Sequence, residues 1–593
     1  MAEAHSSHLP FFKSPLMAHE HSRTSSNTED NKTASVHPYL EEESDDGVFH
    51  DHPQFHRHAE ATNAELFYDL FFVANLTVFT NVHEVNDGDT LKQYIGFFCV
   101  LWFTWYQVGL YDVRFSTDSV FERTAKYCQF LVMMGFAIIG PKFDVGKHMQ
   151  PASEDNADEE GSALPFFKAL TLVLMASRLV LVFQYIASLW FTRHYKQTIL
   201  PMCLMAGTYF IAAVIYLGIF WSFHPVEEGS DHTYIAWYVV AILETIIATT
   251  VSSIWRNISF KGTHLIQRMS LLTLIILGEG VMGLAEKCQR IVHSEGALSF
   301  TASTVGNIIC AVAIYYFLYM LYFDWINSES HFGTIRQQIW SFLHFPLHLA
   351  LVLAVEGVAQ CVTWRAAIVR GNEFINQIND WAIIANETNP DWNEIANQLN
   401  ETVKDLVYKS LLTTSSLSET SEILTYTYPN AINATQVVAN GTADPDAAWG
   451  AVEWSYYTLY KTILNIAGFA GSENSTELDQ LSGQIVNFSD EKASEESSDA
   501  LVKAAGVFDL TFVYFFTTIG LVVILCCLLA ALSKREKTWM HWIRLGVSGL
   551  IGLALCLLSI MDLTDAGGNF AFSPWVLPLV AICLFAGKWI LIC

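Results

Sequence analysis

Charged residues are scarce in this sequence, and basic residues are the scarcer kind. Only 15% of the 593 residues are charged, and 32 Lys and Arg stand against 59 Asp and Glu, which gives a formal net charge of −27. A basic surface that holds nucleic acid is therefore excluded. Hydrophobic residues make up 52% of the chain, too many for a set of water-soluble domains. The composition predicts an all-α integral membrane protein with the lipid bilayer as its main partner.

Several sequence patterns are also missing. The first 60 residues contain no charged segment followed by an apolar core, so we expect no cleaved signal peptide. The chain has no phosphate-binding loop, no HExxH motif and no Cys or His spacing typical of a structural zinc site. We therefore expect no cofactor, no bound metal ion and no catalytic residues.

Long apolar segments recur from residue 64 onward. Helices of about 20 apolar residues are long enough to cross the hydrocarbon core of a bilayer. The pattern predicts a polytopic helix bundle of about twelve transmembrane helices, over residues 64–82, 91–111, 125–141, 164–192, 199–221, 233–254, 265–286, 301–326, 339–364, 505–532, 538–562 and 570–592.

Polarity divides the chain into four regions. Residues 1–60 are polar and rich in Ser, Thr and His, as expected for a disordered tail. Residues 61–365 hold the first nine predicted helices, and residues 505–593 hold the last three. Between them, residues 366–504 are acidic and too long for a simple connection. Apolar side chains at helical spacing over residues 391–412 predict that this loop is partly helical.

Two observations predict the orientation in the membrane. Alternate connections hold 13 Lys and Arg on the side of the N-terminus and 5 on the other side, a bias that places both termini in the cytosol. The loop 366–504 carries Asn-X-Ser/Thr motifs, and glycosylation requires the extracytoplasmic side. The plasma membrane is the simplest destination. The six predicted glycosylation sites are Asn386, Asn400, Asn433, Asn440, Asn474 and Asn487.

A series of short motifs follows the predicted helices in order. They are ELFYDLFFV at 65–73, LWFTW at 101–105, YDVRF at 111–115, SRL at 177–179, HLIQR at 264–268, IILGE at 275–279, LYFD at 321–324 and HFPLH at 344–348. Together they resemble the low temperature requirement A (LtrA) family over about residues 60–365, and more weakly over 505–593. The glycosylation-rich loop is typical of a fungal-type member. The resemblance implies a multi-pass membrane protein whose activity is poorly defined. Gln267 departs from the Glu that the family often has before the Arg.

Ionisable side chains inside predicted helices are the candidate functional residues. Charge at bilayer depth is costly, so it usually faces a partner or a water-filled cavity. Arg178 and Glu244 lie near the midpoints of their helices, and pairing would offset the cost of each. We expect these two, with Asp69 and Glu279, to meet at one polar pathway. The structural alternative for Arg178 is that its pairing only locks helices together.

A second candidate is the helix that begins near residue 339. His344 and His348 lie one turn apart, and Glu356 lies two turns further along nearly the same face. Imidazole titrates near neutral pH, so such a line has the chemistry of a proton relay. The alternative for His344 is a packing role, with a hydrogen bond to a neighbouring carbonyl.

The spacing of charged residues also indicates an internal repeat. Two sets have nearly the same intervals, Arg57–Asp69–Asp112 and Arg268–Glu279–Asp324. This similarity predicts two six-helix halves in parallel orientation, an arrangement found in transporters.

Three functions remain open at this point. Charged groups on separate helices favour a transporter or channel for an ion or small solute. The alternatives are a receptor or scaffold acting through the glycosylated loop, and a membrane-embedded lipid-modifying enzyme using His344, His348 and Glu356. Substrate and oligomeric state are not indicated by the sequence.

Overall fold

The computed structural model describes residues 9–16, 55, 60–82, 85, 87–145, 164–223, 232–293, 298, 300–325, 334–385, 394, 397–398, 401, 463, 467–469, 491–533, 538–563 and 570–589. Within these residues every regular element is a helix, accompanied by an isolated β-bridge between Leu16 and Phe55. The predicted all-α fold is confirmed. The six predicted glycosylation sites, and Arg57 of the predicted repeat, lie outside the described residues.

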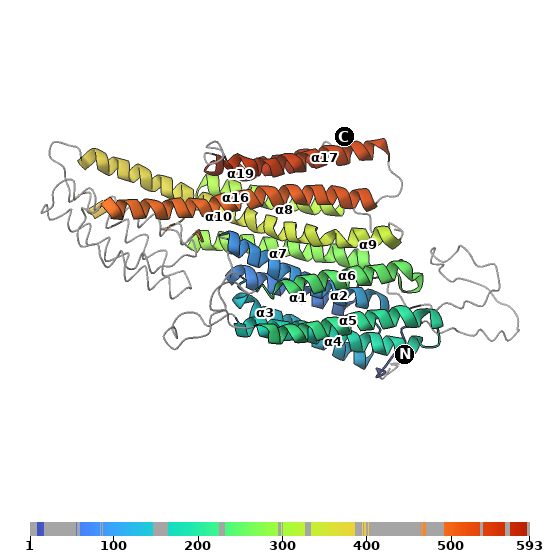
Figure 1. Cartoon of the computed structure of the whole chain (residues 1–593). Coiled ribbons are helices and arrows are strands. Elements are labelled where there is room, and N and C mark those ends of the chain that lie inside the picture. The colour runs from blue at the N-terminus through green and yellow to red at the C-terminus, as the bar shows by residue number, and fades with distance from the viewer. Residues whose placement is uncertain are drawn as a thin grey trace, which may run out of the picture.

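The helices run side by side and form one elongated bundle (Figure 1). Short 3-10 turns extend three of the connections, at Gly140–Lys142, Arg256–Ile258 and Ser559–Leu563. The α-helices are α1 (Asn63–Val82), α2 (Gly88–Phe115), α3 (Val120–Ile139), α4 (Leu164–Thr192), α5 (Lys196–Ser222), α6 (Ile235–Ile254), α7 (Leu265–His293), α8 (Ala302–Phe323), α9 (Thr334–Phe342), α10 (His344–Ala385), α16 (Glu491–Ser533), α17 (Trp539–Leu558) and α19 (Val576–Trp589).

Eight segments of the described chain are long and apolar enough to cross a membrane. The polytopic membrane architecture is thereby confirmed, while the count of twelve stays a prediction. Helices α1, α2 and α3 occupy the predicted spans 64–82, 91–111 and 125–141, but are not among the eight. The eight segments are Leu164–Thr192, Lys196–Ser222, Ile235–Ile254, Leu265–Val292, Ala302–Phe323, Ile335–Glu373, Gly506–Ser533 and Trp539–Met561.

Helix α2 tolerates polar residues because it lies inside the bundle. Every residue from Val100 to Phe115 is buried. Helices α4, α5 and α6 differ, since each keeps large apolar side chains exposed on one side, such as Phe183, Phe210 and Ile246. Lipid tails solvate such surfaces as well as protein does. A helix surrounded by other helices has no such face, so its apolar content need not be high.

A proline divides the predicted span 339–364 into two helices. Helix α9 ends at Phe342 and α10 begins at His344. Pro346 lies in the first turn of α10, where its missing N–H is harmless, but its ring conflicts with a continuous helix through Phe342. Helix α10 then runs for 42 residues, and with α16 it extends beyond the neighbouring helices at one end of the bundle (Figure 1).

Part of the predicted N-terminal tail lies against the bundle. The carbonyl oxygens of Pro10 and Phe11 accept hydrogen bonds from the backbone N–H groups of Val120 and Phe121, both at 3.1 Å. These N–H groups open α3 and have no partner within the helix. Residues 9–16 therefore cap α3 from a distant part of the sequence.

Candidate functional site

The predicted pair of Arg178 and Glu244 forms between α4 and α6. Nε of Arg178 lies 2.9 Å from Oε1 and 3.1 Å from Oε2 of Glu244, and NH2 lies 2.9 Å from Oε2. The remaining terminal nitrogen donates to the hydroxyl of Thr104 on α2 at 3.3 Å. Both charged side chains are buried, with 0% and 2% exposure. One positive and one negative charge thus neutralise each other in a bidentate contact.

A second buried charge site surrounds Arg268, near the start of α7. Its guanidinium contacts carboxylates of two helices: NH1 lies 3.4 Å from Glu65 and 3.1 Å from Asp112, and NH2 lies 3.4 Å from Asp69. All four side chains are at most 3% exposed. Gly109 of α2 lies against the guanidinium, where a Cβ would make an ordinary van der Waals contact of 3.5 Å with its central carbon.

Two further basic groups complete this site. Lys126 of α3 pairs with Asp112. His264, just before α7, places Nε2 3.1 Å from both carboxylate oxygens of Glu65. The resulting Arg268 cluster consists of Glu65 and Asp69 of α1, Asp112 of α2, Lys126 of α3, His264 and Arg268.

The charge balance of the Arg268 cluster depends on one proton. Its three carboxylates contact Arg268 and Lys126, and Glu65 also contacts the imidazole of His264, which is positive only when protonated. Several polar atoms beside these contacts also lack a hydrogen-bond partner in the described part of the chain, namely Oδ2 of Asp69, Nε of Arg268 and the hydroxyl of Tyr68. Buried polar groups are normally hydrogen-bonded, so each of these atoms needs an explanation.

Most of this cluster was not among the residues predicted for the pathway. Only Asp69 was, whereas Asp112 entered the sequence analysis only as a member of the predicted repeat. A signal existed in the sequence. Glu65 and Asp69 are four residues apart, and so are His264 and Arg268, so each helix presents two charged groups of one type on one face. Complementary pairs of this kind favour contact between the two helices.

Glu279 lies further along α7, away from Asp69, Arg178 and Glu244. Its Oε1 accepts a hydrogen bond from the hydroxyl of Thr77 on α1 at 2.6 Å, while Oε2 is buried without a hydrogen-bond partner among the described residues. The next residue, Gly280, allows α7 to approach α10 closely, because a Cβ there would lie 2.6 Å from that of Val355. Glu356 on α10 accepts a hydrogen bond from Gln360 at 3.2 Å.

The two histidines of α10 are buried and each ring nitrogen has a partner. Nδ1 of His344 faces the Trp340 carbonyl at 2.9 Å, and Nε2 faces the hydroxyl of Tyr322 at 2.8 Å. His348 accepts from the indole N–H of Trp102 at 3.1 Å and faces the hydroxyl of Thr273 at 2.8 Å. These partners suit neutral rings, since each histidine has one acceptor-type and one donor-type contact. The carbonyl contact of His344 matches the packing alternative.

The structure distributes the predicted pathway residues over several sites. Arg178 meets Glu244, Asp69 meets Arg268, and Glu279 meets Thr77. The contacts of His348 lead to α2 and α7, and Glu356 accepts a hydrogen bond from Gln360, one turn further along α10. Four charges that were expected to share one pathway therefore occupy three separate contacts.

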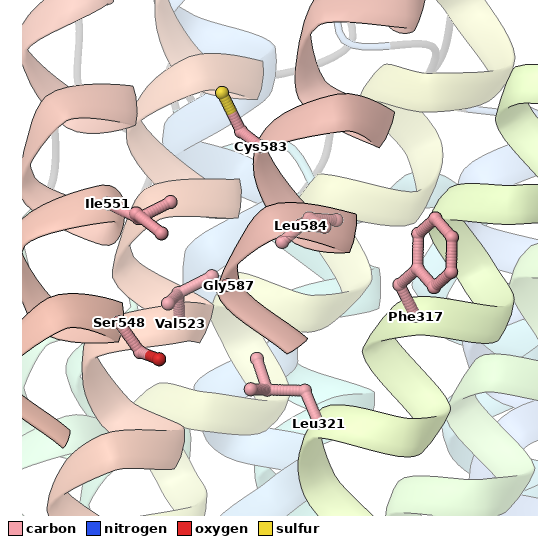
Figure 2. A pocket seen from close by; sticks show the side chains of 8 residues that line it. All are labelled: Phe317, Leu321, Val523, Ser548, Ile551, Cys583, Leu584 and Gly587. Carbon is pink, nitrogen blue, oxygen red and sulfur yellow. The ribbon is translucent and has the colours of Figure 1, made fainter. Parts of the chain in front are cut away.

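Two cavities lie elsewhere in the molecule. One is a cleft of about 290 Å³, counted with its open side, between α8, α16, α17 and α19 (Figure 2). Its lining is almost entirely apolar: Phe317, Leu321, Val523, Ser548, Ile551, Cys583, Leu584 and Gly587. The other lies beside residues 9–16 and has Glu122 in its wall. Neither is lined by a predicted pathway residue.

Buried ion pairs between long apolar helices define a multi-pass integral membrane protein. Residues 60–379 match the family model described as Bacterial low temperature requirement A protein (LtrA). This range is more than half of the chain, so the protein belongs to the LtrA family, as its motifs predicted. The range contains every residue of the Arg268 cluster and the Arg178–Glu244 pair. Searches of curated proteins and of solved structures gave no match.

Proposed function

We propose that this protein moves an ion or small solute across the membrane, as a transporter or channel, and that the Arg268 cluster binds the moving or coupling charge. The observation that carries this proposal is that three buried carboxylates meet Arg268, Lys126 and the titratable His264 where four helix segments meet, so that the site is neutral only when it holds one proton. An uncompensated buried charge is costly. A bundle with a purely structural role gains nothing from such a site, because a balanced pair such as Arg178–Glu244 connects helices equally well.

A second polar level on the same two helices supports a pathway. Arg268 and Glu279 are 11 residues apart on α7, which places them on one face and about 16 Å apart along the axis. Their partners on α1 are Asp69 and Thr77. The contact between α1 and α7 therefore carries ionisable groups at two depths.

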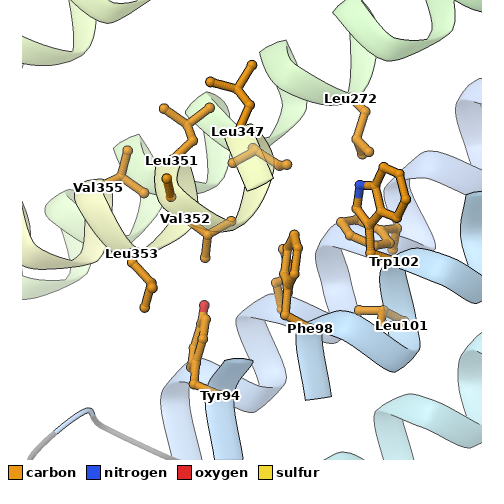
Figure 3. Packing of buried hydrophobic residues seen from close by; sticks show 14 of the residues in the cluster. Tyr94, Phe98, Leu101, Trp102, Leu272, Leu347, Leu351, Val352, Leu353 and Val355 are labelled. Atoms are coloured by element: carbon orange, nitrogen blue, oxygen red, sulfur yellow. The ribbon is translucent and has the colours of Figure 1, made fainter. Parts of the chain in front are cut away.

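An apolar layer joins α2, α7 and α10 (Figure 3). Val352 of α10 points toward Phe98 of α2, and Leu272, which lies between Arg268 and Glu279 along α7, lies beside Trp102; all four apolar side chains are buried. Water and ions do not enter such packing at rest. We assign this conformation to the closed state of the proposed cycle, and opening requires α2, α7 and α10 to separate at this layer.

We further propose that the protein lies in the plasma membrane with both termini in the cytosol and the loop 366–504 glycosylated outside. The support is the excess of Lys and Arg in one set of connections and the six glycosylation motifs in the acidic loop. In this orientation the Arg268 cluster faces the cytosolic half of the membrane and Glu279 the outer half.

The test is ion flux in vesicles containing the purified full-length protein. Trapped fluorescent indicators report the entry of protons, Na⁺, K⁺ or chloride after a gradient of each is imposed. We expect protein-dependent flux of at least one of these ions. Asp69→Asn and Glu279→Gln should each reduce that flux at least tenfold, a loss equivalent to about 1.4 kcal/mol.

Matched exposed acids provide the controls. Asp89→Asn repeats the change of Asp69, and Glu373→Gln repeats that of Glu279, at positions whose side chains are 69% and 46% exposed. Both controls should keep the full flux. Unchanged flux in Asp69→Asn and Glu279→Gln alike would remove the basis for a transport role.

A further inference from the structure

We propose that the Arg268 cluster holds one exchangeable proton and that Oδ2 of Asp69 carries it. This inference rests on the proposed transport function and names its coupling ion as a proton. It also assigns the proton to one atom, so it can be tested without any measurement of transport.

The two oxygens of Asp69 have different surroundings. Oδ1 accepts a hydrogen bond from the indole N–H of Trp105 at 2.6 Å and lies 3.4 Å from NH2 of Arg268. Oδ2 is buried and has no hydrogen-bond partner within the described residues. A carboxylate spreads its charge over both oxygens, so an ionised Asp69 would leave half of that charge unsolvated. A carboxylic acid fits better, with Oδ1 as its carbonyl oxygen and Oδ2 as its hydroxyl.

The charge of the cluster leads to the same assignment. With Asp69 neutral, the carboxylates of Glu65 and Asp112 balance Arg268 and Lys126. Other ionisable groups face this site from the packed elements: His264 before α7, Tyr68 of α1, Arg114 of α2 and Glu122 of α3. Arg114 donates to the hydroxyls of Ser252 and Tyr185, and Glu122 accepts from Tyr111 and Gln184, so their hydrogen bonds are made outside the cluster. His264 is the competing site for the proton, because its protonation would balance the cluster as well.

A metal cation fits the same position poorly. Oδ1 of Asp69 already faces two N–H donors, one of them from a positively charged guanidinium. Na⁺ and Ca²⁺ need several oxygen ligands and are repelled by such neighbours. Within the described ranges, no group of three or more His, Cys, Asp or Glu side chains is arranged to hold a metal ion.

Release of this proton would change the contacts of Arg268. The O–H bond of Asp69 breaks, its electron pair stays on Oδ2, and the proton passes to water or to a carried solute. The new carboxylate then competes for the guanidinium, which in this structure also bridges Glu65 and Asp112. Movement of Arg268 toward α1 would weaken its contact with α2. Proton binding is thereby linked to the packing of α1, α2 and α7.

Infrared spectroscopy of the purified full-length protein tests the assignment. A protonated buried carboxyl gives a carbonyl stretching band well separated from that of a carboxylate, and the band shifts in D₂O. We expect the spectrum of the wild-type protein minus that of Asp69→Asn to contain one such band, which is absent from the matched difference with Asp89→Asn.

A second variant guards against misfolding of Asp69→Asn. Trp105→Phe removes the strong hydrogen bond to Oδ1, so the carbonyl band of Asp69 should move to higher frequency while its area is retained. The assignment would be overturned if the difference band were absent, or if its frequency were the same in Trp105→Phe as in the wild-type protein. An imidazolium signal that disappears in His264→Gln would place the proton on His264 and would equally overturn it.

The two proposals can fail separately. A clear Asp69 band with no protein-dependent flux would leave the proton site standing and remove the transport function. Flux that depends on Asp69 without the band would leave transport standing and remove the proton from Oδ2.

Discussion

Two buried arginines in this bundle carry the same charge and occupy different kinds of site. Arg178 meets one carboxylate in a bidentate contact and has the hydroxyl of Thr104 as a further acceptor. Arg268 is shared by three carboxylates at longer distances, and its Nε has no hydrogen-bond partner in the described chain. A balanced pair has one stable arrangement. A group whose balance depends on one proton has several that are close in energy, which suits a site that must exchange charge.

The largest effect should follow from breaking the balanced pair. Glu244→Gln leaves the charge of Arg178 buried without a counter-charge, so the free energy of unfolding should fall by about 3–5 kcal/mol. Unfolding by denaturant in detergent micelles measures this loss. The double variant Arg178→Met, Glu244→Leu should recover most of it and keep its flux. A double variant as unstable as Glu244→Gln alone would contradict the interpretation of the pair as a helix lock.

Arg268→Met should have a somewhat smaller effect, on the order of 3 kcal/mol, that depends on pH. Three carboxylates then remain with Lys126, and the folded protein must bind protons that the unfolded chain does not hold. Stability should therefore fall as the pH rises. The loss in Glu244→Gln should stay constant with pH, because Arg178 remains charged throughout.

The control for Arg268→Met is Arg256→Met, at an exposed position. It should change neither the stability nor its pH dependence. The comparison of the two sites would be wrong if Arg268→Met and Glu244→Gln showed the same pH dependence.

Adjacent residues of α2 each make a hydrogen bond to one of the two sites, so the strengths of these two hydrogen bonds can be compared. Trp105→Phe removes the 2.6 Å hydrogen bond to Asp69, and Thr104→Val removes the 3.3 Å bond from Arg178. We expect about 1.5–3 kcal/mol for the first and about 1 kcal/mol for the second, since Arg178 keeps its bidentate partner. Thermal unfolding of both variants measures the difference. Equal losses would mean that the hydrogen bond to Asp69 is not a strong one.

The smallest effect belongs to an exposed ion pair, which shows how much burial contributes. Arg123 contacts Asp118 at 2.8 Å between side chains that are 65% and 59% exposed, and it lowers the pKa of the Asp118 carboxyl. The pair therefore adds stability above the pKa of the unfolded chain, and this is lost as the pH falls through the folded pKa. Asp118→Asn should cost less than about 1 kcal/mol, and only at low salt. If the loss of stability in Asp118→Asn were the same in high salt, it would contradict the view that solvent ions screen this exposed pair.

Much of the architecture could be predicted because its causes are local. Runs of apolar residues indicate helices and their approximate ends, and each predicted span overlaps a helix of the structure. The pairing of Arg178 with Glu244 also followed from local reasoning, since two isolated charges of opposite sign at mid-membrane favour each other. The break at Leu343 was missed, although Pro346 was visible in the motif at 344–348.

The shared pathway of Asp69, Arg178, Glu244 and Glu279 could not be judged in the same way. Helical periodicity predicts which side chains share a helix face, and it therefore places Glu65 with Asp69 on one face and His264 with Arg268 on another. It does not predict which helices are neighbours. Asp69 and Arg268 are 199 residues apart, and their contact depends on α1 packing between α2, α3 and α7.

The sequence by itself thus determined the class of the protein, the positions of its helices and the presence of charges at bilayer depth, because the hydrophobic effect and helical geometry act over short stretches of chain. The tertiary structure alone decided that one arginine has a single carboxylate partner and the other has three. A buried charge is neutralised by whichever groups the packing brings within a few ångströms, and packing is a property of the whole bundle.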